Sequence, residues 1–211
     1  MRPSTDYSKV TSQASGRVGR LVVVADSLPR HWMPEVESIV SYVTIEAFSV
    51  WYGLNRSVFL ACATGAKHPT VGRIATPHGR LDAQGALDRA VWFSNSSKTG
   101  QSKQWTHRDE PSWGDQAQVA RVFRKLAPSN HSDFLAAWGV QSRFMSDLPT
   151  FRNYYAHKSE SSARKAKALA ASYGVPGTPS PTEILLFRRP SASEPVLAAW
   201  LLDMQNVVSF Y

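Results

Sequence analysis

Arg152, Asn153 and His157 are the residues whose types and spacing best suit chemistry on a phosphate, and they lie together in the stretch FRNYYAHKSE. Arginine presents a planar fork of donors that matches a phosphate group, and histidine titrates near neutral pH without perturbation. On a helix, Asn153 and His157 share a face because they are four residues apart, while Arg152 lies on the adjacent row. These groups together suit acid-base chemistry on a phosphodiester.

The residues that follow this motif are strongly basic. We interpret four of them as candidate contacts for an RNA backbone, namely Lys158, Arg164, Lys165 and Lys167. The alternative is a solvated helix face, which is the usual explanation of a charge run taken alone. The sequence leaves both interpretations open.

A helix is expected to position the motif. Asp147 can cap this helix, Pro149 suits its first turn, and the stretch GVPGTPSP at 174–181 stops it. We therefore predict one helix that runs from Asp147 to about Tyr173.

Most of the remaining chain also has helical spacing. We predict a long apolar helix, or a pair bent near Gly53, between Pro34 and Gly65, and shorter helices at 81–93, 116–127, 133–145 and 193–211. The ranges 20–26 and 183–189 fit either a helix or a strand, and the Ser-, Gly- and Lys-rich range 94–115 is expected to be a long loop. The sum is an all-α bundle of about five to six helices with a long central loop. We expect one domain over 18–211, after a flexible polar tail at 1–17.

The composition favours a polyanionic partner. The chain carries 24 Lys and Arg against 16 Asp and Glu, which gives a formal charge of +8. Such a charge fits nucleic acid or an acidic membrane surface, although it can also serve solubility alone. A hydrophobic share of 43% with 11% aromatics supplies a core and argues against wholesale disorder.

Cysteine content and apolar patterning indicate a cytoplasmic protein that does not span a membrane. Cys62 is the one cysteine of the chain, so no intramolecular disulfide and no cysteine-based metal site is expected. The apolar stretch 39–63 contains Glu46, Asn55 and Arg56, each costly in a lipid core. The first residues also lack the apolar core of a secretory signal.

The stretch RNYYAH, from Arg152 to His157, resembles the signature of the HEPN superfamily. Ribonucleases of this superfamily are compact helical bundles that carry an arginine, four to six residues and then a histidine, commonly with asparagine directly after the arginine. The bare pattern also occurs at 73–78 and 124–131, but both of those segments contain a proline and would not form a continuous helix. The resemblance covers about ten residues and the all-helical architecture.

The resemblance implies a metal-independent endoribonuclease in which two copies of the motif meet in a homodimer. His157 would transfer a proton to or from the ribose 2′-hydroxyl and the leaving 5′-oxygen, Arg152 would stabilise the charge on phosphorus, and Asn153 would orient Arg152 or the phosphate. A toxin or abortive-infection effector is the role expected of such a protein, with an antitoxin or other regulatory protein as a possible partner. Ser159 stands where some family toxins carry a tyrosine modified by a nucleotidyltransferase antitoxin, so that type of partner is not expected.

Other functional assignments remain open at this point. A catalytically silent HEPN-like module that binds RNA or a protein is the alternative function, and a purely structural or regulatory helical protein is a third. Glu46, Arg56 and Tyr154 are candidates to line or support the site, although Glu46 and Arg56 more often form ion pairs.

The loop at 94–115 offers two weaker candidates. The segment HRDE at 107–110 is conceivable as a metal site, but no second ligand cluster lies at a helpful spacing, so we expect neither a metal nor a cofactor. Trp105 and Trp113 are the tryptophans that could stack on unpaired bases.

Overall fold

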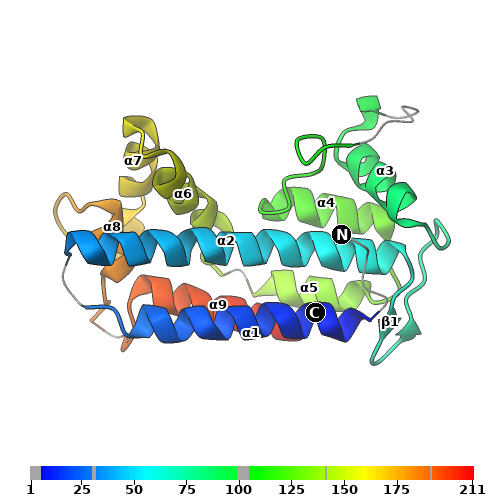
Figure 1. Ribbon diagram of the computed structural model, residues 1–211, viewed down its shortest axis with the longest axis horizontal. Coiled ribbons are helices and arrows are strands. Elements are labelled where there is room, and N and C mark those ends of the chain that lie inside the picture. Colours follow the sequence, from blue (N-terminus) through cyan, green and yellow to red (C-terminus); the bar gives the residue numbers. More distant parts are fainter. Residues whose placement is uncertain (1–5, 30–31, 99–104, 141, 191) are drawn as a thin grey trace. The chain divides into compact units, whose positions relative to one another are not determined.

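Helices dominate the structure (Figure 1). The computed structural model describes residues 6–29, 32–98, 105–140, 142–190 and 192–211. Its α-helices are α1 (Tyr7–Asp26), α2 (Pro34–Ala63), α3 (Ala83–Ser94), α4 (Gln116–Leu126), α5 (His131–Gly139), α6 (Phe144–His157), α7 (Glu160–Lys167), α8 (Pro181–Leu186) and α9 (Val196–Phe210). The expectation of an all-α fold is confirmed. More helices form than were predicted, because the helix expected at 147–173 is divided and short segments such as α8 are helical.

The remaining regular elements are small. Strands β1 (Lys67–His68) and β2 (Gly72–Arg73) form an antiparallel hairpin in which Lys67 pairs with Arg73 and His68 with Gly72. Two 3-10 turns, η1 (Ser96–Lys98) and η2 (Ala170–Tyr173), complete the set. No described helix combines the length and apolar character needed to cross a membrane.

The contacts divide the chain into two compact units, each described here by itself. Unit 1 comprises 1–14, 51–140 and 208–211, and unit 2 comprises 15–50 and 141–207. Helix α2 contributes its C-terminal part to unit 1 and its N-terminal part to unit 2.

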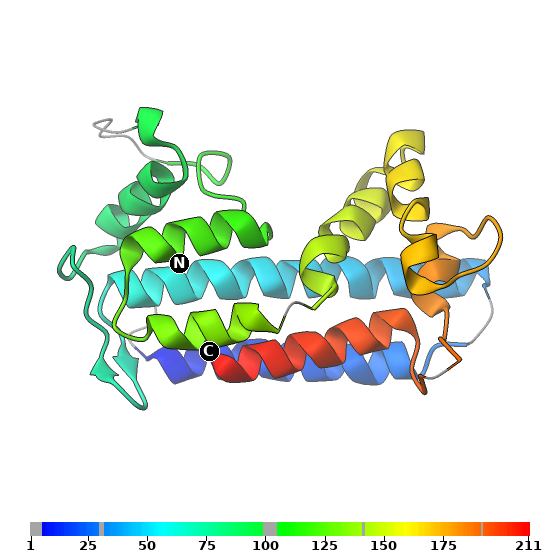
Figure 2. The ribbon, with the colours of Figure 1, turned by 180° about the vertical axis from the view of Figure 1, so that it is seen from behind.

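Unit 1 is built around an aromatic cluster. Phe123 lies at the centre of this cluster, with ring centroids 4.4 Å from Phe134, 5.5 Å from Phe59 and 5.6 Å from Trp138. Helices α4 and α5, which carry three of these rings, flank the C-terminal part of α2 (Figure 2). Burying such rings supplies most of the stabilisation available to a unit of this size.

A chain of buried hydrogen bonds fixes the end of the polypeptide within unit 1. The Trp138 indole donates to the Tyr211 hydroxyl at 3.1 Å, and that hydroxyl donates to the Asn55 side chain at 3.0 Å. The amide nitrogen of Asn55 in turn donates to the Trp113 carbonyl at 3.0 Å. Each of the polar groups joined by these three hydrogen bonds therefore has a partner, which offsets the cost of burying it.

The first helix corrects the expectation of a flexible tail at 1–17 over residues 7–17, while residues 1–5 lie outside the described part of the chain. Helix α1 begins at Tyr7, whose side chain is only 1% exposed and packs edge-on against the His68 ring at 4.7 Å. The buried positions of α1 recur at helical spacing, but the many Ser, Thr and Gln residues between them conceal the pattern in the sequence. They are Tyr7, Ala14, Val18, Leu21 and Ala25.

Unit 2 contains the motif helix α6. In Figure 1, α6 and α7 lie on one side of the N-terminal part of α2, and α1 and α9 lie along the other. Phe151 of α6 packs edge-on against Trp200 of α9 at 5.4 Å, and the Tyr155 hydroxyl hydrogen-bonds the Thr182 hydroxyl of α8 at 2.9 Å.

Both ambiguous segments, 20–26 and 183–189, prove to be helical over most of their length.

Candidate functional site

Helix α6 has one face for the core and another for the candidate motif. Phe151 and Tyr155, four residues apart, are buried, whereas Asn153 and His157 are exposed and Arg152 is half-buried. The four-residue spacing of each pair places its members on a common face. The core residues therefore determine the orientation in which α6 presents the motif.

The guanidinium of Arg152 is held in place by two neighbours. Its central carbon lies 5.0 Å from the centre of the Phe48 ring of α2, and Nη1 donates to the Asn153 side-chain oxygen at 3.0 Å. A cation over an aromatic face is attracted by the ring quadrupole and loses some of its rotamer freedom. This hydrogen bond lets Asn153 orient the Arg152 guanidinium.

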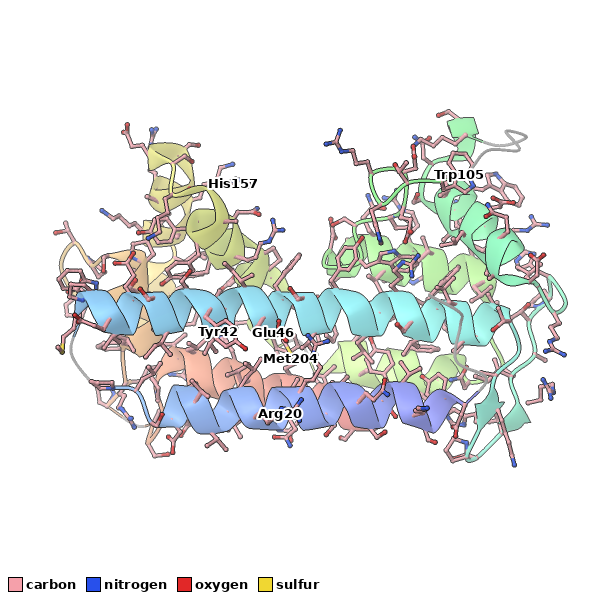
Figure 3. The ribbon with its side chains drawn as sticks, in the orientation of Figure 1. Arg20, Tyr42, Glu46, Trp105, His157 and Met204 are labelled. Atoms are coloured by element: carbon pink, nitrogen blue, oxygen red, sulfur yellow. The ribbon has the colours of Figure 1, made fainter. Side chains whose placement is uncertain are left out.

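His157 is the last residue of α6 and is exposed. Figure 3 shows it at the end of this helix, while Glu46 lies on α2. His157 follows Arg152 by five positions, which corresponds to about 140° around a helix. Asn153 shares the face of His157, and the Arg152 guanidinium contacts both the Phe48 ring of α2 and the Asn153 side-chain oxygen.

The predicted helix from Asp147 to Tyr173 is wrong in its second half. Helix α6 ends at His157 because Lys158 adopts a left-handed conformation, with φ 46° and ψ 31°. Ser159 then caps α7 by accepting a hydrogen bond from the Ser162 amide at 3.2 Å. Asp147 is not the N-cap either, since α6 begins at Phe144 and includes Pro149 in its interior.

The four basic residues lie on α7 and at its junction with α6, and their side chains are exposed. Lys158 pairs with Glu37 of α2 at 3.3 Å, and Arg164 pairs with Glu160 at 3.6 Å. Exposed pairs of this kind contribute at most about 1 kcal/mol and separate easily. Lys165 and Lys167 follow on the same helix, and the charge of Lys167 contributes to lowering the pKa of Glu183, after hydrogen bonds from Ser180.

The structure assigns structural partners to the residues expected to support the site. Glu46 forms an ion pair with Arg17 of α1 within unit 2. Arg56 lies in unit 1, where it makes a two-pronged ion pair with Glu110 at 2.6 and 2.8 Å. Tyr154 packs edge-on against Tyr155 at 4.9 Å, and burial raises the pKa of its hydroxyl.

The described part of the loop at 94–115 is anchored to unit 1. Trp113 is fully buried and donates to Glu110 at 2.9 Å, so it cannot stack on a base. Trp105 is half-buried and its indole donates to Asp88. Glu110, one of the conceivable metal ligands, is occupied by Arg56 and Trp113, and the described residues contain no cluster of three His, Cys, Asp or Glu suited to a metal ion.

Sequence reasoning missed a pocket of about 600 Å³ in unit 2. Trp32 and Phe187 supply its aromatic lining, Glu183 and Arg188 its charged lining, and most of the remainder is apolar. Only the exposed tryptophan before Pro34 could have signalled it, because the other lining residues come from the loop and helix at 175–188.

Glu37 connects this pocket with the motif. One carboxylate oxygen accepts from the Lys158 ammonium at 3.3 Å, and the other accepts from the Trp32 indole at 3.3 Å. Glu37 and Phe48 are eleven residues apart on α2 and hence share a face, since eleven residues make about three turns. The same face of α2 therefore contacts Arg152, Lys158 and Trp32.

No protein-family model, curated protein or solved structure matches this chain.

Proposed function

We propose that the protein is a metal-independent endoribonuclease whose site is formed by Arg152, Asn153 and His157 of two copies of α6. The observation that carries this proposal is the arrangement of α6: a positioned guanidinium, an exposed imidazole, and a cationic helix directly after them. The HEPN-like spacing of these residues supports the same function.

The proposed chemistry is an attack of the ribose 2′-hydroxyl on the adjacent phosphorus. His157 of one copy accepts the 2′-hydroxyl proton, and His157 of the second copy gives a proton to the departing 5′-oxygen. The products are a 2′,3′-cyclic phosphate and a 5′-hydroxyl. Arg152 stabilises the extra negative charge on the non-bridging oxygens, and the requirement for a 2′-hydroxyl confines cleavage to RNA.

Two copies are needed because a single α6 supplies one imidazole. Cleavage with separate acid and base requires two proton-handling groups. A two-fold axis beside the exposed face of α6 would supply the second imidazole and a guanidinium from the other copy.

The test is a cleavage assay with labelled RNA at saturating concentration in the presence of EDTA. We expect a cyclic phosphate product, and we expect His157→Ala and Arg152→Ala each to reduce the rate roughly a hundredfold. Ser161→Ala, an exposed change on α7, is the matched control and should cleave like the parent. A His157→Ala variant that cleaves as fast as the parent would refute the function, and so would cleavage that requires added magnesium.

A double variant separates RNA binding from the chemical step. Lys165→Ala combined with Lys167→Ala should weaken RNA binding at all sequences and make its salt dependence shallower, while turnover at saturating RNA is retained. RNA binding by the parent without any cleavage would instead favour the alternative, a catalytically silent module.

A toxin or abortive-infection effector is the cellular role that fits such an activity. Expression of the parent should then arrest growth, and expression of His157→Ala should not. Equal growth of the two strains at equal protein levels would contradict this role. An antitoxin or other regulatory protein would restrain the activity in the natural host.

A further inference from the structure

The pocket of unit 2 has the composition of a site for a flat, partly polar ligand. Trp32 is 47% exposed, and Phe187 is half-buried. Small-molecule sites typically span 300–1,000 Å³ with an apolar lining and a few polar groups, and this pocket, at about 600 Å³, falls within that range. An exposed aromatic ring beside such a volume offers a stacking surface.

Two charged side chains give the pocket a defined polarity. Arg188 donates from Nη1 to the Ser193 carbonyl, and its charge contributes to lowering the pKa of Glu194, after hydrogen bonds from Ser193 and the Glu194 backbone. The Nε–H of Arg188 is buried and has no acceptor among the described residues. A buried donor without an acceptor costs free energy that an incoming acceptor would recover.

Glu183 supplies the negative charge of the pocket. One of its oxygens accepts from the Ser180 amide at 2.7 Å in a capping box at the start of α8. Hydrogen bonds from Ser180 lower the pKa of Glu183, so its carboxylate stays ionised. A carboxylate next to a stacking ring accepts hydrogen bonds from an amino group and repels a carbonyl oxygen.

The residues that line the pocket also interact, directly or through Glu37, with two of the four basic residues at and after the motif. Glu37 links the Trp32 indole to Lys158, the residue directly after His157, and Lys167 of α7 acts electrostatically on Glu183. Lys158 is therefore linked through Glu37, and Lys167 through Glu183, to residues that line the pocket. A ligand with a flat ring and a phosphate on the same short unit would satisfy both the pocket and these basic residues.

We infer that the pocket receives one unpaired nucleobase of the RNA, stacked on Trp32, with Glu183 favouring a base that carries an amino group. This inference rests on the proposed function for its choice of RNA. Adenine, cytosine and guanine present amino donors, whereas uracil presents carbonyl acceptors at the same edge. The pocket would thus position the strand at the α6 motif and select which nucleotides lie next to the cleaved bond.

The test measures binding without cleavage. Fluorescein-labelled tetranucleotides of A, C or U with 2′-O-methyl riboses lack the attacking hydroxyl, and their affinity for the full chain can be followed by anisotropy. Oligo(A) and oligo(C) should bind the parent more tightly than oligo(U). Trp32→Ala should weaken oligo(A) binding roughly tenfold, as loss of one base stack does, while Trp32→Phe should retain most of the affinity.

The controls separate stacking from folding. Trp92→Ala removes a half-buried tryptophan of unit 1 and should leave affinity unchanged. Glu183→Gln should reduce the preference for oligo(A) over oligo(U) while affinity for oligo(U) holds or rises. Thermal melting verifies that each variant is folded; Trp32 is exposed, so its replacement should be tolerated.

The outcomes distinguish this inference from the proposed function. Equal oligo(A) affinity for Trp32→Ala, Trp92→Ala and the parent would overturn the base pocket, even if the parent cleaves RNA. Binding that depends on Trp32 in a protein that cleaves no RNA would support the pocket and remove the ribonuclease. A parent that does not distinguish oligo(A) from oligo(U) would overturn the role of Glu183.

Discussion

Arg152 is the residue whose placement most constrains the chemistry. Phe48 and Asn153 hold its guanidinium, and this contact joins residues far apart in the sequence. The resemblance to HEPN proteins implied that Asn153 orients Arg152 or the phosphate. The sequence could not predict Phe48, because the pairing depends on how α6 packs on α2.

The contact with Phe48 leads to a kinetic prediction. Phe48→Leu should release Arg152 and lower the maximal cleavage rate about three- to tenfold, because a cation over an aromatic ring is worth about 1 kcal/mol. Phe48→Tyr keeps the ring and should retain the parental rate. A steady-state assay that separates kcat from KM checks this. Equal kcat for Phe48→Leu and Phe48→Tyr would show that the ring does not position Arg152.

Glu110 is a buried carboxylate whose negative charge stabilises the fold through its ion pair with Arg56. Burial alone would raise its pKa, but hydrogen bonds from Arg56 and Trp113 outweigh burial and hold the pKa below its ordinary value. A lowered carboxyl pKa stabilises the fold above the unfolded pKa, and this contribution is lost as pH falls through the folded pKa. The carboxylate is only 3% exposed and Arg56 18%, so the pair is well shielded.

The loss of folding stability on replacing Glu110 should therefore depend on pH. Glu110→Ala should lower the free energy of unfolding by about 3 kcal/mol at pH 7, because it leaves the Arg56 charge buried and unpaired. The difference from the parent should shrink as pH is lowered below the ordinary range of a glutamate. Urea denaturation at several pH values measures it. If the difference in free energy of unfolding between variant and parent grew as pH fell, the ion pair between Glu110 and Arg56 would be contradicted.

At the scale of elements, periodicity predicted the helices that bury a continuous apolar stripe. The ranges predicted for α2, α4 and α9 agree closely with Pro34–Ala63, Gln116–Leu126 and Val196–Phe210. The interruption at Lys158 was missed because a lysine, unlike glycine, gives no sign of a left-handed conformation. The Ser159 cap followed by Glu160 was the available signal.

Two substitutions at Lys158 distinguish a divided helix from a continuous one. Both Lys158→Gly and Lys158→Ala remove the ion pair with Glu37, so their difference reports the backbone. With φ at 46°, the glycine variant should be more stable than the alanine variant by about 1 kcal/mol. Inside a continuous helix the order would be reversed by a similar amount. Chemical denaturation of the two variants decides between these signs.

At the scale of the whole molecule, two copies are proposed to share each site. A single α6 supplies one imidazole, whereas cleavage with a separate acid and base needs two proton-handling groups. The sequence predicted a homodimer through its resemblance to HEPN proteins and through the single motif histidine of each chain.

Mixing the parent with an inactive variant tests this sharing. The proposed chemistry needs His157 from both copies, so a heterodimer of the parent with His157→Ala carries one imidazole and should be inactive. After unfolding and refolding together in equal amounts, we expect about a quarter of the activity of the same total amount of parent, because a quarter of the dimers carry both imidazoles. Half of that activity, with heterodimers verified by differently tagged copies, would show that the two histidines do not act across the interface.

The division of α6 into a buried and an exposed face also has an evolutionary consequence. Phe151 and Tyr155 hold the helix in the core, while Asn153 and His157 contribute little packing. A single codon change at position 157 could thus abolish catalysis without a folding defect for selection to remove. Cleaving and merely binding forms of the proposed ribonuclease would therefore share an unchanged scaffold.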